Sequence, residues 1–229
     1  MSAELLINVT PSESRVALIE NGILQEVHVE RHTKRGLVGN IYRGKVSRVL
    51  PGMQAAFVDI GLEKAAFLHA SDIVIHNEVV GEVSTSHIEK HDIRDLVRDG
   101  QDIVVQVVKD PIGTKGARLT TDITIPSRYL VFMPSVTHVG VSQRIEDEAE
   151  RERLKELVSA FCDEDGGFIL RTAAEGVSHP EVAADADFLR RLWSKIQQRL
   201  KRRKSHVLYE DLPLARRVLR DFVGTELDR

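Results

Sequence analysis

Hydrophobic and polar residues alternate along the first part of the chain. Residues 4–10, 15–20 and 23–31 follow a period of two, which predicts three β-strands. The dipeptide Asn21-Gly22 separates the last two and favours a tight hairpin. Because three short strands cannot bury an apolar face by themselves, we expect this sheet to pack on a later part of the chain.

The next segment predicts a small barrel with aromatic side chains on its polar face. Alternation places Phe57 on the same face as Asp59, and Phe67 on the same face as His69. Further strands are predicted at residues 102–109 and 116–122, after a polar insertion at residues 75–91.

Exposed aromatic rings on a small barrel suit the binding of single-stranded nucleic acid. The preceding strand adds the cations Arg43, Lys45 and Arg48, which favour the same function. The alternative interpretation of each ring is a partly exposed core phenylalanine.

After residue 126 the pattern becomes mixed α and β. It predicts an apolar run at 129–133, a charged helix at 146–161, a strand at 167–172 and a long helix. Ser178 and Glu181 bracket Pro180 as a capping box at the start of that helix. Its expected buried stripe is Phe188, Leu189, Leu192, Trp193 and Ile196.

A final helix from about residue 213 is expected to present one apolar side, formed by Leu214, Val218, Leu219 and Phe222.

Composition narrows the functional classes. The 229 residues are 42% hydrophobic with a net charge of -3, so nucleic-acid binding would depend on local patches of cations. Cys162 is the single cysteine, which excludes an internal disulfide and a cysteine-built zinc site within one chain and fits a reducing compartment. No segment reads as a membrane span or a secretory signal, so we expect a cytoplasmic protein with no membrane partner.

Several long stretches resemble the ribonuclease E and ribonuclease G family, in its amino-terminal part and nearest to the ribonuclease G branch. They are residues 5–13, 22–26, 40–61 and 113–121, and Phe168-Ile-Leu-Arg-Thr-Ala. The resemblance implies an α+β, multi-subdomain fold. Residues 1–35 would be the first part of a ribonuclease H-like subdomain, and residues 213–229 would be the start of the return to it. Between them, residues 36–122 would form an S-one-type OB-fold β-barrel that binds RNA, and residues 123–212 would form an α/β 5'-end sensor subdomain.

The resemblance also implies roles for particular residues. Phe57 and Phe67 match an aromatic pair that contacts RNA bases, with the cation Lys115 beside them. Arg171 and Thr172 match a pair that holds a 5'-terminal monophosphate. The same pocket would be supported by Val131 and by Ser127, where ribonuclease E has glycine. By residue type alone, an ordinary surface ion pair is the favoured interpretation of Arg171 at a strand end, and the resemblance reverses that preference.

The resemblance implies that the intact protein is a magnesium-dependent endoribonuclease. The resemblance implies cleavage of single-stranded, A/U-rich RNA with a 5'-monophosphate, in ribosomal RNA maturation and messenger RNA decay. The family's aspartate strands, which hold Mg²⁺, and its Cys-Pro-x-Cys zinc link between protomers of the homo-oligomer do not occur in this sequence. We therefore expect no catalytic residue and no bound metal here, and an RNA-binding chain that does not cleave. The alternatives are a stand-alone RNA-binding module or adaptor, and a small nuclease built from unobvious carboxylates.

Overall fold

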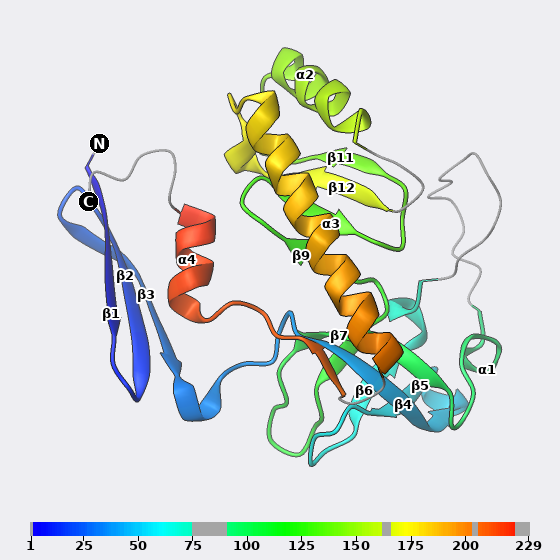
Figure 1. Ribbon diagram of the computed structural model, residues 1–229. Helices are drawn as coiled ribbons and strands as arrows, with labels where there is room; N and C mark the ends of the chain where they lie inside the picture. Colours follow the sequence, from blue (N-terminus) through cyan, green and yellow to red (C-terminus); the bar gives the residue numbers. More distant parts are fainter. Residues whose placement is uncertain (1, 75–90, 162–165, 203–205, 223–229) are drawn as a thin grey trace.

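The computed structural model describes residues 2–74, 91–161, 166–202 and 206–222 (Figure 1). Nearly all of the predicted insertion at 75–91, and Cys162, lie outside these residues. The described chain has a mixed α+β fold that contains three sheets, one of which closes into a barrel.

The amino-terminal sheet is the antiparallel meander that the alternation predicts. It consists of β1 (Ala3–Val9), β2 (Glu13–Glu20) and β3 (Ile23–Arg31), with β2 in the centre. Asn21 and Gly22 both have a positive φ, 49° and 77°, as the tight hairpin between β2 and β3 requires.

Helix α4 (Leu214–Phe222) provides the packing partner that this sheet needs. Leu214 and Val218 bury themselves against Val16 of β2. The carboxylate of Glu30 accepts hydrogen bonds from the backbone N–H of Leu214 (3.0 Å) and from Nη2 of Arg217 (3.1 Å). Figure 1 shows α4 between this sheet and the rest of the molecule.

The prediction that four residues form the apolar side of α4 is correct for two of them. Leu219 and Phe222 are 47% and 37% exposed, whereas Leu214 and Val218 are buried. Leu219 directly follows Val218, and one residue turns a helix by roughly 100°, so the two side chains do not share one face.

Five of the described strands close into a barrel of the OB-like type. They are β4 (Ile41–Leu50), β5 (Ala55–Asp59), β6 (Ala66–His69), β7 (Asp102–Lys109) and β8 (Arg118–Thr120). The first half of β4 pairs with β7 and its second half with β5, while β6 and β8 run parallel. The short helix α1 (Ile93–Leu96) lies between β6 and β7 in the chain, and β13 (Val207–Tyr209) adds to the edge of β4.

Two glycines allow the close approaches that closure requires. A Cβ on Gly44 would lie 2.4 Å from Cγ1 of Val58, and one on Gly116 would lie 1.9 Å from the carbonyl oxygen of Ala65. Both distances are far below van der Waals contact, so neither position accommodates a side chain without movement of the barrel.

The third sheet has the order β11-β12-β10-β9. Its strands are β9 (Ile125–Pro126), β10 (Leu130–Met133), β11 (Val139–Val141) and β12 (Gly167–Leu170). Helices α2 (Glu148–Ser159) and α3 (His179–Arg202) pack on it, and α3 continues down to the barrel (Figure 1). Four single-turn 3-10 helices lie at His32–Lys34, Pro51–Met53, Ala70–Asp72 and Thr172–Ala174.

Four of the five residues in the predicted stripe of α3 pack on the core, two of them buried and two partly buried. Leu189 and Ile196 are fully covered, and Trp193 packs edge-on against Phe132 with ring centroids 6.4 Å apart. The prediction for Phe188 is wrong, because this side chain is 52% exposed. It lies one residue before Leu189, and one residue turns a helix by roughly 100°, away from the sheet.

The capping box at the start of α3 forms in part. The carboxylate of Glu181 accepts hydrogen bonds from the backbone N–H (3.2 Å) and the hydroxyl (2.8 Å) of Ser178. The reciprocal bond, in which the serine hydroxyl accepts from the helix backbone, is therefore replaced by a second bond to the same carboxylate.

Candidate functional site

An aromatic pair lies on the outer surface of the barrel. Phe57 of β5 and Phe67 of β6 are directly opposite each other in the strand register, with ring centroids 6.4 Å apart and planes at 69°. Both side chains are half-buried, while Val58 and Leu68 point into the barrel and are fully buried. The alternation prediction for these two strands is therefore confirmed, and each ring leaves surface for a further contact.

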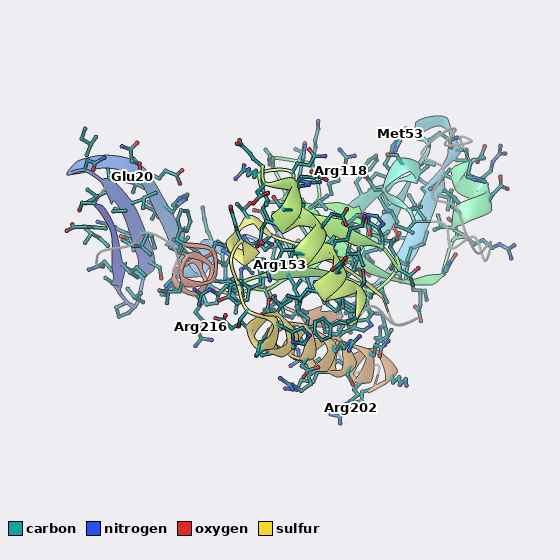
Figure 2. The ribbon with its side chains drawn as sticks, turned by 90° about the horizontal axis from the view of Figure 1, so that it is seen from above. Glu20, Met53, Arg118, Arg153, Arg202 and Arg216 are labelled. Carbon is teal, nitrogen blue, oxygen red and sulfur yellow. The ribbon has the colours of Figure 1, made fainter. Side chains whose placement is uncertain are left out.

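The row of residues through this pair continues with arginine on both sides. In the register, Arg48 of β4 lies opposite Phe57, and Arg118 of β8 lies opposite Phe67. Nε and Nη2 of Arg118 donate to the two carboxylate oxygens of Asp72, at 2.9 and 3.2 Å, and the side chain of Arg118 remains 43% exposed. Figure 2 labels Arg118 among the side chains of the molecule. The result is an aromatic surface bounded by two guanidinium groups.

Lys115 lies in the loop that leads into β8, and this loop runs beside β6. The carbonyl of Ala117, two residues further on, accepts a hydrogen bond from the backbone N–H of Phe67 (2.7 Å). Lys115 is exposed, and Lys64 reaches the same loop through the carbonyl of Gly113 (2.5 Å). A cation thus accompanies the aromatic pair on this side.

The other two predicted cations lie further from the rings. Lys45 is opposite Asp59 on one side and Asp102 on the other, so carboxylates offset its charge. Arg43 lies near the start of β4, where its backbone N–H bonds to the carbonyl of His206 (2.7 Å). At the rise of a β-strand it is roughly 16 Å along the strand from Arg48.

Arg118 is the cation that the sequence analysis missed. It lies within residues 113–121, which carried the resemblance, and period two places it outward, so the signal was present. Its strand has only three residues, and the parallel pairing with β6 cannot be deduced from local pattern.

A second group of polar side chains surrounds Arg171, which directly follows β12. Nη1 of Arg171 donates to the carbonyl of Ser127 (2.7 Å) and lies 2.6 Å from Oδ1 of Asp221 in α4. The side chain of Arg171 is 28% exposed. The guanidinium is therefore held at one edge and still reaches the surface.

Ser127 shapes the turn that carries one of these acceptors. Its hydroxyl and the backbone N–H groups of Tyr129 (2.9 Å) and Leu130 (3.1 Å) all bond to the same oxygen of Asp185 in α3. A carboxylate that accepts several hydrogen bonds fixes the turn on the helix. Ser127 itself is 4% exposed, so its side chain organises the turn from within, and its carbonyl is what contacts Arg171.

Thr172 follows Arg171 in the chain, and Val131 lies on β10, the strand paired with β12. Thr172 is exposed, and its hydroxyl is 3.1 Å from that of Ser142, a residue that the sequence analysis did not single out. Val131 is half-buried in β10, opposite Ile169 of β12. The structure therefore brings together all four predicted residues, in one region at the ends of β9, β10 and β12.

Glu150 of α2 supports this region from the other side. Its carboxylate binds Arg153 through two hydrogen bonds (2.6 and 2.7 Å) and accepts a third from the backbone N–H of Gly176 (2.8 Å). The side-chain bonds from Arg153, together with the backbone bond, lower the pKa of Glu150 to about 2 against the opposing effect of burial. The segment after Thr172 is thereby tied to α2.

Among the residues that the structure describes, no three His, Cys, Asp or Glu side chains are grouped as ligands for a metal ion. Within the same residues, no helix is both long and apolar enough to cross a membrane.

Comparison with known proteins identifies the class of the chain. The model of the Ribonuclease E/G family matches residues 124–229, and similarity to individual family members extends over the whole chain. The chain belongs to this family.

Two of the similar proteins are named Ribonuclease G. The chain is 67% identical to that of Escherichia coli strain K12 and 64% identical to that of Haemophilus influenzae. The match with the E. coli protein covers 100% of this chain and 47% of that protein. A protein named Ribonuclease E, from Nostoc sp., is 39% identical over 84% of this chain and 27% of its own length. The chain thus spans about half the length of the Ribonuclease G sequences.

The depressed pKa of Glu150 predicts sensitivity to acid. A carboxylate with a lowered folded pKa stabilises the fold above the ordinary pKa of glutamate, 4.5, and loses that contribution as the pH falls toward about 2. The variant Glu150→Gln should unfold at a lower temperature than the parent chain at pH 7, and the difference should shrink below pH 4.5. Thermal unfolding followed by circular dichroism between pH 3 and 7 measures this. A difference that grew in acid would contradict the assignment.

Proposed function

We propose that this chain is the RNA-binding and 5'-monophosphate-sensing portion of a ribonuclease G-like endoribonuclease that cleaves single-stranded RNA. One observation carries the proposal: Phe57 and Phe67 lie side by side on the outside of an OB-like barrel, between two arginines. Aromatic rings of this kind stack on bases of any sequence, while guanidinium groups contact the backbone phosphates.

The second part of the proposal concerns the region around Arg171. A planar guanidinium that reaches the surface beside a threonine hydroxyl is suited to two oxygens of a terminal phosphate. Ser127, Val131 and Thr172 form the walls and the supporting turn.

The proposal divides the chain by role. Residues 1–35 and 213–229 belong to a ribonuclease H-like subdomain, 36–122 to the S-one-type barrel, and 123–212 to the 5'-end sensor. In the intact enzyme Mg²⁺ supports hydrolysis and Zn²⁺ links protomers of a homo-oligomer, with ligands that this chain does not provide. Its substrates are A/U-rich, 5'-monophosphorylated RNAs in ribosomal RNA maturation and messenger RNA decay, in the cytoplasm.

One gel tests the core of the proposal. A short, 5'-monophosphorylated, A/U-rich RNA is incubated with the purified chain and Mg²⁺, and the expected result is retarded migration without cleavage. Cleavage that persists after a contaminant check would show a nuclease site within this chain. Absence of both retardation and cleavage would contradict RNA binding.

The aromatic pair should supply much of the affinity. Phe57→Ala and Phe67→Ala should each weaken binding of any single-stranded RNA by roughly 1 to 3 kcal/mol, which is about 5- to 150-fold in Kd. Fluorescence anisotropy with a labelled oligonucleotide measures the change. Phe188→Ala is a control, because it removes an exposed phenylalanine ring from α3, an element outside the barrel. Unchanged affinity in both barrel variants would refute the stacking role.

Arg171 should distinguish one kind of RNA end from another. Arg171→Ala should weaken binding of 5'-monophosphorylated RNA and leave binding of the same RNA with a 5'-hydroxyl unchanged. Loss of a charge-assisted hydrogen bond is worth about 1.5 to 3 kcal/mol, and because Arg171 is partly exposed we expect the lower end, about tenfold in Kd. Arg191→Ala, which removes an exposed guanidinium from α3, controls for general charge loss. Equal weakening for both RNAs would contradict the assignment.

A further inference from the structure

The guanidinium of Arg171 is held by one of its edges. Nη1 donates hydrogen bonds to the carbonyl oxygens of Ser127 (2.7 Å) and Arg128 (3.5 Å). It also forms an ion pair with the carboxylate of Asp221 (2.6 Å). Within the described residues, Nε and Nη2 of Arg171 make no hydrogen bond. These two nitrogens form the parallel pair of donors that suits two oxygens of a carboxylate or a phosphate.

Asp221 is itself fixed by a second arginine. Nε and Nη2 of Arg220 lie 3.1 and 3.0 Å from its two oxygens, and the side chain of Arg220 is 13% exposed. Burial raises the pKa of Asp221, but the hydrogen bonds from Arg220 and Arg171 outweigh it and leave that pKa below its usual range. Asp221 is therefore ionised and its single negative charge lies between two guanidinium groups. Nη1 of Arg220 also lies 3.6 Å from the carboxylate of Asp211, so the two arginines and two aspartates are neutral overall. Recognition of an anion here therefore depends on the open edge of Arg171 and not on excess positive charge.

Helix α4, which carries Asp221, is anchored away from Arg171. Leu214 and Val218 pack on Val16 of β2, and Glu30 of β3 bonds to the first turn of α4. Arg171 and its two carbonyl acceptors belong to the sheet of β9–β12 and its turn. The ion pair with Asp221 thus connects the amino-terminal sheet to the region proposed to bind the 5'-phosphate (Figure 1).

We propose that Asp221 is a positioning residue for recognition of a terminal phosphate monoester: it fixes Nη1 of Arg171 so that the Nε and Nη2 edge faces the phosphate. This inference rests on the proposed 5'-sensing function. Without Asp221, Arg171 keeps its charge but loses a defined orientation, and ordering it again on binding costs conformational entropy.

The test measures a ratio of affinities. The Kd of the 229-residue chain is determined by anisotropy for one RNA sequence carrying either a 5'-hydroxyl or a 5'-monophosphate. The ratio is the Kd for 5'-hydroxyl RNA divided by the Kd for 5'-monophosphorylated RNA, and it should exceed one in the parent chain. In Asp221→Ala it should fall by about two- to tenfold, as expected for one freed side chain, with the Kd for 5'-hydroxyl RNA unchanged. Asp221→Asn keeps an oxygen that accepts from Nη1, so its ratio should lie between the two.

Controls separate positioning from charge and folding. Glu175→Ala removes one negative charge from an exposed residue close to Thr172, and its ratio should match that of the parent chain or exceed it. Thermal unfolding verifies that each variant is folded. If Asp221→Ala does not fold, the ratio measured for the isosteric variant Asp221→Asn decides the test.

The outcomes distinguish the two proposals. A parent chain without any preference for the 5'-monophosphate would refute the sensing function and this inference with it. A parent preference that both Asp221 variants retain would refute the inference alone. A preference that rises in Asp221→Ala would refute it as well, because the carboxylate would then be a competitor of the phosphate.

Discussion

Strand β4 is the constraint on which the other parts of the structure depend. Its ten residues pair with β7 in the first half, with β5 in the second and with β13 at the outer edge. The double pairing requires a bend, which Gly44 permits because no side chain separates it from Val58. Closure by β4 places Arg48 beside Phe57. At its other end, Ile41 enters the core that supports the sheet of β9–β12.

Buried apolar contacts position the elements, but carboxylates position the groups around Arg171. Asp185 holds the turn whose carbonyl Arg171 binds, Asp221 holds Arg171 itself, and Glu150 holds the segment after Thr172. Each carboxylate accepts hydrogen bonds from two or more groups on different elements. A directional network of this kind fixes atoms more closely than packing does. The pKa values of Glu150 and Asp221 are lowered by the hydrogen bonds from their arginine partners, so these two carboxylates stay ionised to a lower pH than a free side chain would.

Local pattern predicts the parts of the structure that are themselves local. Period two found the strands of the amino-terminal sheet and the outward direction of Phe57 and Phe67, because alternation follows directly from strand geometry. Strands β9, β11 and β13 were missed because two or three residues are too few for a period to appear. Phe188 was misplaced because the apolar stripe of a helix does not reveal how wide its contact surface is.

Contacts between distant segments explain what the sequence could not reveal about the candidate site. Arg171 and Thr172 were recognised through family resemblance, and by residue type alone a surface ion pair was the favoured interpretation of Arg171. The structure does contain such an ion pair, with Asp221 fifty residues further along the chain. Neither interpretation excludes the other, because a guanidinium has two edges and the ion pair uses only Nη1. No periodicity or spacing encodes which edge is used.

The two surfaces suit different parts of an RNA chain. A protein with a net charge of -3 has little long-range attraction for polyphosphate, and near the aromatic pair Asp72 offsets part of the charge of Arg118. Stacking then dominates on the barrel, and it is similar for every internal nucleotide. A terminal monophosphate differs from an internal phosphate by its additional charge and its free oxygens, which are what the open edge of Arg171 can bind. In the proposed function, the barrel therefore provides affinity that is common to all single strands, and Arg171 adds a contact that only one kind of end can make.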